Sequence, residues 1–261
     1  MKISYNDIGT GPVLVLLHGF CESKWIWKSF ESVMNDHFRV ISVDLPGFGE
    51  SEKINGEISI DELADILQDF LSSLKIQQCT MIGHSLGGYI TLSFAERHSA
   101  MLNGFGLFHS TAFDDSQEKK DNRNKTLSFI EKHGVDLFAK SFVAPLFNPT
   151  KRNDLKAEID QLINIASNTS KKTIIEVTKA MRDRPDKIQV LKKTMLPVMF
   201  IIGKADTAIP LEASLKQCYL PNDTTIHLYE KTGHMGMFER RIETIECIKN
   251  FANYCNRIKC Q

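Results

Sequence analysis

The fold of this chain is decided by residues 80–89, which read Thr-Met-Ile-Gly-His-Ser-Leu-Gly-Gly-Tyr. An apolar, β-forming run leads into one abrupt turn, and apolar residues at helical spacing follow it. A strand that reverses directly into a helix strains the turning residue, and the glycines of Gly83-x-Ser85-x-Gly87 leave room for that strain. The pentapeptide also occurs by chance in plain turns. Its place between a strand and a helix favours a nucleophile elbow, in which the serine hydroxyl stands clear of the sheet.

Strands and helices alternate on both sides of this stretch. Apolar runs without alternation are typical of parallel strands covered on both faces, and residues 13–17 are one example. Ser59 and Glu62 form the capping-box pattern at the start of a helix that reaches residue 74. We expect strands at 2–8 (a weak edge), 13–17, 39–45, 79–82 and 103–108, with a further helix at 25–35. Such alternation predicts an α/β fold with parallel strands and right-handed crossovers.

The alternation stops after the strand at 103–108. Residues 113–190 contain no convincing buried strand, and helices are expected at 119–132, 134–141, 151–167 and 171–182. The α/β pattern then resumes with strands at 197–203 and 225–229, a helix from about 210 and a closing helix at 239–256. We therefore predict an α/β core in two parts, residues 1–112 and 191–261, interrupted by a helical cap or lid at 113–190.

The predicted cap carries a slight excess of Lys and Arg over Asp and Glu. A solvated basic face explains this more simply than the steering of an acidic substrate. Its aromatic residues are expected to pack onto the core, and some could line an apolar acyl pocket. They are Phe113, Phe129, Phe138, Phe142 and Phe147.

Composition gives no reason to expect a nucleic-acid or membrane partner, because Lys plus Arg and Asp plus Glu number 32 each in 261 residues. The first residues lack the apolar segment of a signal peptide, and the run 13–17 is too short to cross a bilayer. The cysteines show no CxxC pairing, which indicates free thiols in a cytoplasmic protein. They are Cys21, Cys79, Cys218, Cys247, Cys255 and Cys260. GxGxxG, P-loop and HExxH motifs are absent, so no cofactor and no metal are expected.

A serine hydroxyl needs a neighbouring base, and functional side chains of a parallel sheet gather beyond the carboxyl ends of its strands. Among the histidines that directly follow a strand, His234 is favoured because Gly233 and Gly236 flank it. The side chain of His84 must point away from its neighbour Ser85 in the elbow. His18 is interpreted as a residue that shapes its loop, and His109 stays possible although the cap begins there.

A base of this kind needs a carboxylate that orients it and stabilises the imidazolium. Asp206 follows the strand at 197–203 with no helix between them, although it could simply cap a turn or helix. Asp114 and Asp115 compete for the role, and Asp44 is expected to fix a loop instead.

Acyl transfer also requires donors for a developing oxyanion. The backbone N–H of Leu86, the residue after the serine, is one donor, and a second comes from the loop after the first buried strand. That loop begins His18-Gly19-Phe20, so the N–H of Phe20 is our candidate. Backbone donors leave the identity of these side chains free.

Taken together, these motifs resemble the α/β-hydrolase superfamily, specifically its serine hydrolase or carboxylesterase-like branch with a helical cap. The motifs are Leu17-His18-Gly19-Phe20, Asp44-Leu45-Pro46-Gly47-Phe48-Gly49-Glu50-Ser51, Gly83-His84-Ser85-Leu86-Gly87-Gly88, Gly203-x-x-Asp206 and Gly233-His234. The resemblance covers nearly the whole chain. It implies an α/β-hydrolase fold with Ser85 as nucleophile, Asp206 as acid, His234 as base, and Phe20 and Leu86 as oxyanion donors, in the family's chain order.

The resemblance also narrows the expected reaction. A single Gly19 in place of a Gly-Gly-Gly run resembles the branch that acts on small or medium acyl groups, and Ser85 in place of aspartate argues against haloalkane dehalogenases and epoxide hydrolases. We expect a serine hydrolase that cleaves a small ester-like molecule through an acyl-enzyme. Enol-lactonases, C–C bond hydrolases and non-haem perhydrolases share the triad and stay as alternatives. A non-catalytic small-molecule receptor is disfavoured because all three triad residues are present.

Overall fold

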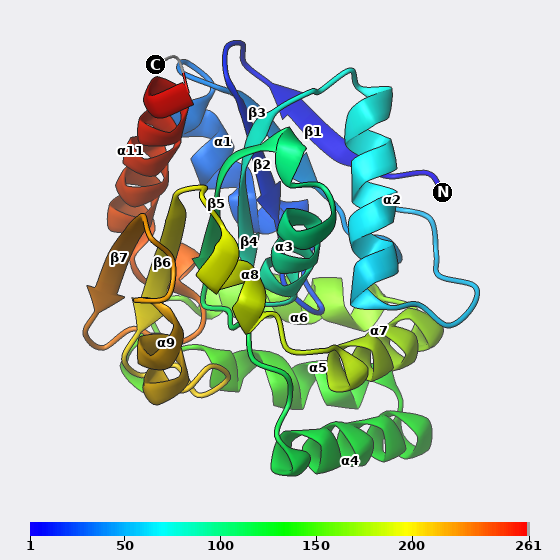
Figure 1. Cartoon of the computed structure of the whole chain (residues 1–261). Coiled ribbons are helices and arrows are strands. Elements are labelled where there is room, and N and C mark those ends of the chain that lie inside the picture. Colours follow the sequence, from blue (N-terminus) through cyan, green and yellow to red (C-terminus); the bar gives the residue numbers. More distant parts are fainter. Residues whose placement is uncertain (260–261) are drawn as a thin grey trace.

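Residues 1–259, which the computed structural model describes, form a seven-stranded sheet with the strand order β1-β3-β2-β4-β5-β6-β7 (Figure 1). Every neighbouring pair is parallel except β1 and β3, which run antiparallel at one edge. The strands are β1 (Tyr5–Ile8), β2 (Val13–Leu17), β3 (Arg39–Val43), β4 (Cys79–His84), β5 (Leu102–Phe108), β6 (Val198–Gly203) and β7 (Thr224–Tyr229).

Helices cover both faces of the sheet. On one face lie α1 (Lys28–Met34) and α11 (Arg241–Lys259), and on the other lie α2 (Ile60–Ser73), α3 (Leu86–Arg97) and α8 (Ile188–Lys193). Two shorter helices, α9 (Leu211–Gln217) and α10 (Gly236–Glu239), accompany the last two strands. Short 3₁₀ helices occupy Lys24–Trp27, Ser99–Met101, Ala144–Leu146 and Pro149–Lys151.

Between β5 and β6 the chain is helical. This segment supplies α4 (Gln117–His133), α5 (Val135–Val143), α6 (Lys156–Asn168), α7 (Lys171–Asp183) and α8. Helices α4 to α7 lie together below the sheet in Figure 1, beyond the carboxyl ends of the parallel strands. They therefore stand over the edge where side chains from strand-end loops collect.

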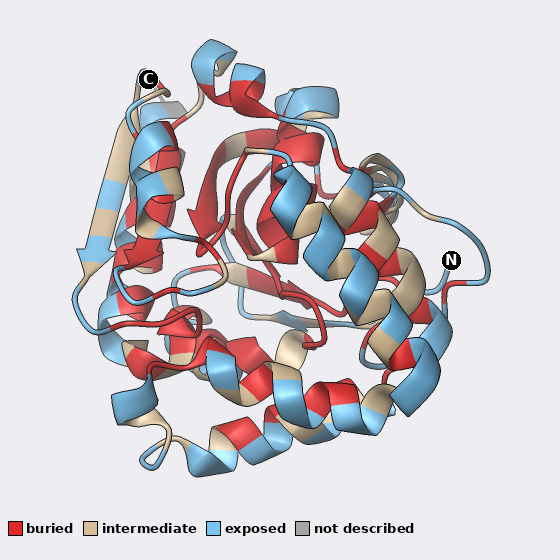
Figure 2. Ribbon diagram, turned by 90° about the horizontal axis from the view of Figure 1, so that it is seen from below, coloured by how far each residue is buried: buried red, intermediate tan, exposed pale blue. Residues whose placement is uncertain are grey.

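The core follows from the apolar strands of the sequence. All residues of β4 and β6 are buried, and β2 is buried from Leu14 to Leu17, as expected of strands covered on both sides. Figure 2 shows this buried interior framed by helices whose outer faces are exposed. On α2 the predicted capping box is present, because the N–H of Ser59 donates to Glu62 Oε2 (2.7 Å) and the N–H of Glu62 donates to Ser59 Oγ (3.1 Å).

The expected α/β-hydrolase fold is confirmed, with differences at the ends of elements. The helix expected at 25–35 begins as a 3₁₀ turn and becomes α-helical only at Lys28. The helix expected from 151 begins at Lys156, because Pro149 starts a 3₁₀ turn before it. Helix α8 was not predicted. Its six residues are too few for an apolar period to stand out.

The two ends of the helical segment are joined by one buried ion pair. The Arg184 Nη1 donates to Asp115 Oδ1 (2.8 Å) and its Nη2 donates to the Phe113 carbonyl (2.9 Å). The same guanidinium lies over the ring of Tyr89 on α3, 3.9 Å from its centroid, and Arg123 of α4 binds the other oxygen of Asp115. We call this contact the Asp115–Arg184 clasp. It also holds both ends of the segment against the helix that follows the elbow.

No helix within residues 1–259 is long and apolar enough to cross a bilayer. Among the described residues, Cys21, Cys218, Cys247 and Cys255 are buried free thiols and Cys79 is buried, while Cys260 lies outside the described residues.

Candidate active site

Ser85 occupies a strained turn between β4 and α3. Its backbone adopts φ +50° and ψ −112°, which an L-residue rarely takes. The flanking glycines permit the turn by close approach, since a Cβ on Gly83 would lie 2.2 Å from the carbonyl oxygen of Gly87. A Cβ on Gly87 would in turn lie 2.6 Å from the carbonyl oxygen of Leu17 on β2. The local sequence thus forces the sharp reversal that the motif predicts.

His234 and Asp206 meet beyond the ends of β7 and β6. The ring Nδ1 of His234 donates to Asp206 Oδ2 (2.8 Å), while Asp206 Oδ1 accepts the backbone N–H of Ala208 (2.8 Å) and of Ile209 (2.9 Å). Both side chains are buried. The carboxylate is therefore fixed from both oxygens, and it fixes the ring in turn.

Burial alone would raise the pKa of Asp206, but the charge of His234 and its hydrogen bond hold that pKa below its usual range. For His234, burial would lower the pKa, but the charge of Asp206 and its hydrogen bond raise it above the ordinary histidine value. The pair is thus an ionised acid beside an unusually basic imidazole.

Ser85 and His234 line one cavity of about 230 Å³. Most of its wall is apolar, and it is formed by Phe20, Phe138, Phe142, Leu146, Met181 and Ile209. Of the aromatic residues considered for an apolar pocket, Phe138 and Phe142 thus lie on it, while Phe147 is buried in the core. A polar side comes from Lys119, Asn122, Arg123 and Thr126 of α4.

The candidate oxyanion donors come from two different segments of the chain. Leu86 is the first residue of α3, and Phe20 follows β2, the strand next to β4. The intervening N–H of Gly19 donates to Glu22 Oε2 (2.6 Å), so it is already occupied. The Phe20 N–H therefore stays our candidate for the second oxyanion donor.

Two other histidines, His18 and His84, have both ring nitrogens in contact with other groups of the protein. His18 donates from Nδ1 to the Gly19 carbonyl (2.7 Å) and accepts the Leu45 N–H at Nε2 (2.9 Å). His84 has Nδ1 beside Glu22 Oε2 (3.1 Å) and Nε2 beside the His234 carbonyl (3.0 Å). Neither ring has a nitrogen left to act as a base.

The competing carboxylates are also accounted for. Asp44 accepts the N–H groups of Lys24 and Glu50 and pairs with Lys24 Nζ (2.6 Å), which fixes the loop after β3. Asp115 belongs to the clasp, and Asp114 is exposed. Glu22, buried on the cavity wall, was missed by sequence reasoning, because its partner His84 lies 62 residues away.

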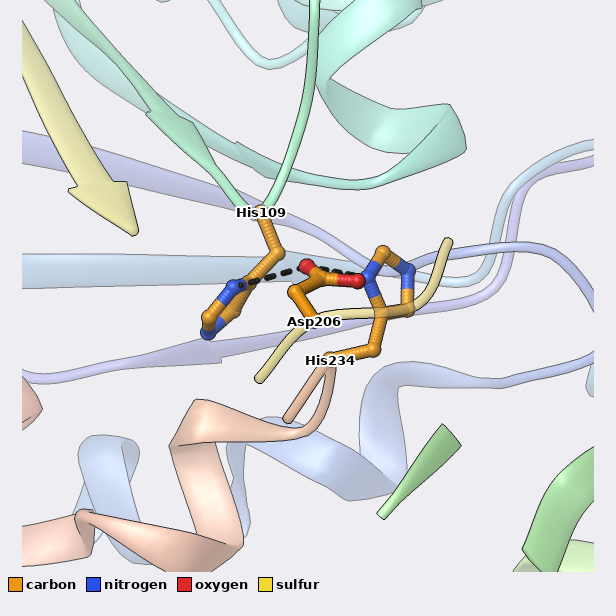
Figure 3. A group of neighbouring side chains, drawn as sticks. All are labelled: His109, Asp206 and His234. Carbon is orange, nitrogen blue, oxygen red and sulfur yellow. Dashed lines mark hydrogen bonds and ion pairs between the residues drawn. The ribbon is translucent and has the colours of Figure 1, made fainter. Parts of the chain in front are cut away.

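A third histidine faces the same carboxylate. The Nδ1 of His109, the residue after β5, lies 3.1 Å from Asp206 Oδ2, so the carboxylate stands between two imidazoles (Figure 3). Burial lowers the pKa of His109 to about 4. Sequence reasoning left this residue as a possible base. The structure places it beside the acid, across the Asp206 carboxylate from His234.

His109, Asp206 and His234 each offer one possible ligand atom, and these atoms lie within 4.8 Å of one another. Histidine and carboxylate are the donors that transition metals use. Here, however, the carboxylate lies between the rings and is bound through Oδ1 to two backbone N–H groups. The arrangement is that of a hydrogen-bonded acid and base, and we assign no metal to it.

Comparison with known proteins agrees with this architecture. A family model described as alpha/beta hydrolase fold matches residues 12–241. The esterase of Thermogutta terrifontis superimposes with a TM-score of 0.92 at 25% identity, covering 97% of this chain and 93% of that one. The enol-lactonase of Burkholderia xenovorans superimposes with a TM-score of 0.88 at 19% identity, covering 95% of each chain, and so shares the fold.

A curated relative carries a different reaction name. The 2-hydroxy-6-oxononadienedioate/2-hydroxy-6-oxononatrienedioate hydrolase of Paraburkholderia phymatum is 27% identical over 258 residues, which cover 92% of this chain and 86% of that protein.

Proposed function

Because this chain belongs to the alpha/beta hydrolase fold family, we propose that it is a serine hydrolase that cleaves a carboxylic ester of a small or medium-sized molecule. The observation that carries the proposal is that His234 both hydrogen-bonds to Asp206 and lines the same cavity as Ser85. The hydrolase fold is common to every alternative below, and the similar proteins named above are enzymes that act on small molecules.

In the proposed reaction, the Ser85 Oγ attacks the ester carbonyl carbon while the Nε2 of His234 takes the hydroxyl proton. Asp206 keeps the other ring nitrogen protonated and stabilises the imidazolium. The N–H groups of Leu86 and Phe20 stabilise the negative oxygen, and one such donor typically contributes about 10²–10³ in rate. The imidazolium then protonates the leaving alcohol.

The second half of the reaction uses the same groups. Water, activated by the Nε2 of His234, attacks the acyl-enzyme carbonyl, and Ser85 leaves with the proton returned by the ring. No cofactor takes part in this sequence of steps. The buried free thiols of Cys21, Cys218, Cys247 and Cys255 fit a reducing compartment, and we propose the cytoplasm.

We further propose that residues 113–190 act as a cap that selects the substrate. Support comes from the cavity wall, to which α4, α5 and α7 all contribute, with Lys119, Phe138 and Met181 as examples. The core parts 1–112 and 191–261 then supply the triad, and the cap supplies the specificity.

The direct test is labelling with a fluorophosphonate probe. Wild-type protein is expected to be labelled stoichiometrically, and Ser85→Ala is expected to stay unlabelled. The matched control is Ser72→Ala, which should be labelled like the wild type. Ser72 is exposed and lies in the last turn of α2. Equal labelling of Ser85→Ala would end the assignment.

A second candidate is cleavage of an acidic substrate, either at a carbon–carbon bond or in an enol lactone. It is favoured by Lys119, a half-buried cavity residue that donates to the Ala208 carbonyl (3.1 Å) and has no carboxylate in ion-pair range among residues 1–259. The name of the Paraburkholderia relative is that of a dicarboxylate hydrolase.

A panel of short p-nitrophenyl esters, lactones and ring-cleavage diketones separates these reactions, with Ser85→Ala as background. Perhydrolase activity is measured by adding hydrogen peroxide and a carboxylic acid. Ligand binding with no turnover on any panel member would instead support a receptor.

A further inference from the structure

Like His18 and His84, His109 is a buried imidazole that the proposed reaction does not use. Its side chain is fully enclosed, and its Nδ1 lies 3.1 Å from Asp206 Oδ2, the same oxygen that His234 reaches at 2.8 Å. Neither ring nitrogen of His109 has a well-aligned hydrogen bond to any group in residues 1–259. An apolar side chain would fill this space without burying two polar nitrogens, so filling space does not by itself explain a histidine here.

The surrounding chain makes room for this ring. His109 itself takes a left-handed backbone conformation, with φ +48°, directly after β5. A Cβ on Gly236 would lie 2.5 Å from its Nε2, and a Cβ on Gly203 would lie 2.9 Å from its Cε1. The ring stacks on Phe108, with centroids 5.1 Å apart. A strained residue and two glycines are thus all arranged around one imidazole.

Burial decides the state of this ring. With a pKa lowered to about 4, His109 is neutral at ordinary pH and carries a single ring proton. If that proton were on Nε2, the Nδ1 lone pair would face an ionised carboxylate oxygen at 3.1 Å. The tautomer with the proton on Nδ1 instead points a donor at Asp206, so it is the favoured one.

We propose that His109 is a positioning residue for the triad, which shares Asp206 Oδ2 with His234 through its Nδ1–H and so sets the pH at which His234 takes up a proton. The proposal rests on the proposed roles of Ser85, Asp206 and His234. Because one oxygen serves two donors, it stabilises the His234 imidazolium less than it would alone. His234 therefore stays an unprotonated base to lower pH.

Other charged groups face the same pair and must stay constant in a test. Glu22, from the loop after β2, raises the pKa of His234, and Lys119 of α4 lowers it. His84, at the end of β4, faces His109, and Glu239 of α10 interacts with Asp206. None of these is changed by substitution at position 109.

The test compares two variants that separate the ring from its donor. His109→Phe replaces the five-membered imidazole by a somewhat larger six-membered aromatic ring that has no N–H. His109→Asn loses the ring, tolerates a left-handed φ, and can place its amide N–H where Nδ1 was. The measurement is the pH profile of kcat/KM on the best ester of the panel, whose acidic limb reports the free enzyme's base.

For His109→Phe we expect the acidic limb to move up by about 0.5 to 1 pH unit, while His109→Asn stays within about 0.2 unit of the wild type. An unmoved limb in a folded His109→Phe would overturn the proposal, and so would equal shifts in both variants. Fluorophosphonate labelling of the same preparations keeps the two hypotheses apart. An unlabelled wild type counts against the serine chemistry, whereas a labelled wild type with an unmoved His109→Phe limb counts against His109 alone.

Should His109→Phe fail to fold, ¹⁵N-histidine NMR of the wild type gives the answer, with the ring assigned by its loss in His109→Asn. We expect a neutral ring protonated at Nδ1 that does not titrate between about pH 5 and 8. A ring protonated at Nε2, or one that titrates in this range, would overturn the proposal.

Discussion

At the scale of single residues, the site is organised around one carboxylate. Asp206 accepts two backbone N–H groups on one oxygen and faces two imidazoles with the other. In the proposed reaction its role is electrostatic, because it would keep His234 in the tautomer that can take a proton from Ser85.

Replacing Asp206 by Asn is therefore expected to lower kcat about 10³–10⁴-fold, with a much smaller change in KM. The amide keeps the shape but can hold the wrong tautomer of His234. Steady-state kinetics on a p-nitrophenyl ester measure the effect, and Asp183→Asn, at an exposed ion pair with Arg182, is the control. A loss of less than tenfold would contradict the role given to Asp206.

The dependence of kcat/KM on pH follows from the raised pKa of His234. A protonated imidazole cannot accept the Ser85 proton, so activity is lost as the pH falls through that pKa. Because the pKa is raised, we expect the midpoint of the acidic limb above the ordinary histidine value of about 6.5. The rate is measured from about pH 5 to 9 at constant ionic strength, and a midpoint below that value would show that the charge of Asp206 does not reach the ring.

At the scale of elements, the turn between β4 and α3 has no space for a larger residue. Gly83→Ala would bring a Cβ to 2.2 Å from the Gly87 carbonyl oxygen, a backbone atom that cannot swing away. We expect a free energy of unfolding lowered by more than about 2 kcal/mol, with loss of fluorophosphonate labelling.

Gly56→Ala is the matched control for this change. Position 56 has nothing within 4 Å of an added Cβ, so stability should stay within about 0.5 kcal/mol of the wild type. Urea unfolding followed by circular dichroism measures both variants. A Gly83→Ala protein as stable and as reactive as Gly56→Ala would show that the elbow can relax.

Helix α4 brings its own charge to the cavity. Lys119→Gln is expected to raise KM about tenfold for esters that carry a carboxylate, since one ion pair is lost, and to leave neutral esters nearly unchanged. The comparison of hemisuccinate and neutral butyrate esters measures it. Lys125→Gln, on an exposed position of the same helix, is the control, and equal effects on both esters would remove Lys119 from substrate selection.

How much of this the sequence could predict depends on how local each feature is. The elbow and the capping box are set by residues within a few positions of each other, so their patterns predicted them. The Glu22–His84 pair and the approach of His109 to Asp206 join residues that lie far apart in the chain. Such residues are brought together only by the packing of strand ends, and this packing leaves no periodic pattern in the sequence.

At the scale of the whole molecule, the Asp115–Arg184 clasp is a buried contact that a single substitution can break. Asp115→Ala would leave the buried Arg184 and its neighbour Arg123 without their carboxylate. Breaking a buried pair in this way is expected to cost about 3–5 kcal/mol of stability.

The adjacent Asp114→Ala is the natural control, because Asp114 is exposed and should change stability by less than about 0.5 kcal/mol. Both are measured by urea unfolding, with the fluorophosphonate reaction rate as a second readout. Similar stability of the two variants would mean that the two arginines find other partners.

The clasp has a consequence for how such a protein can diversify. It joins residues separated by 69 positions, so the long helical excursion leaves and re-enters the sheet at nearly the same point. The helical segment therefore constrains the sheet no more than a short loop between the same two strands would. The helices between the two junction residues can therefore be exchanged for others of different length, in evolution or by design, provided that Asp115 and Arg184 are kept. The site residues of the core would stay unchanged, and the new helices would give the protein a different substrate preference.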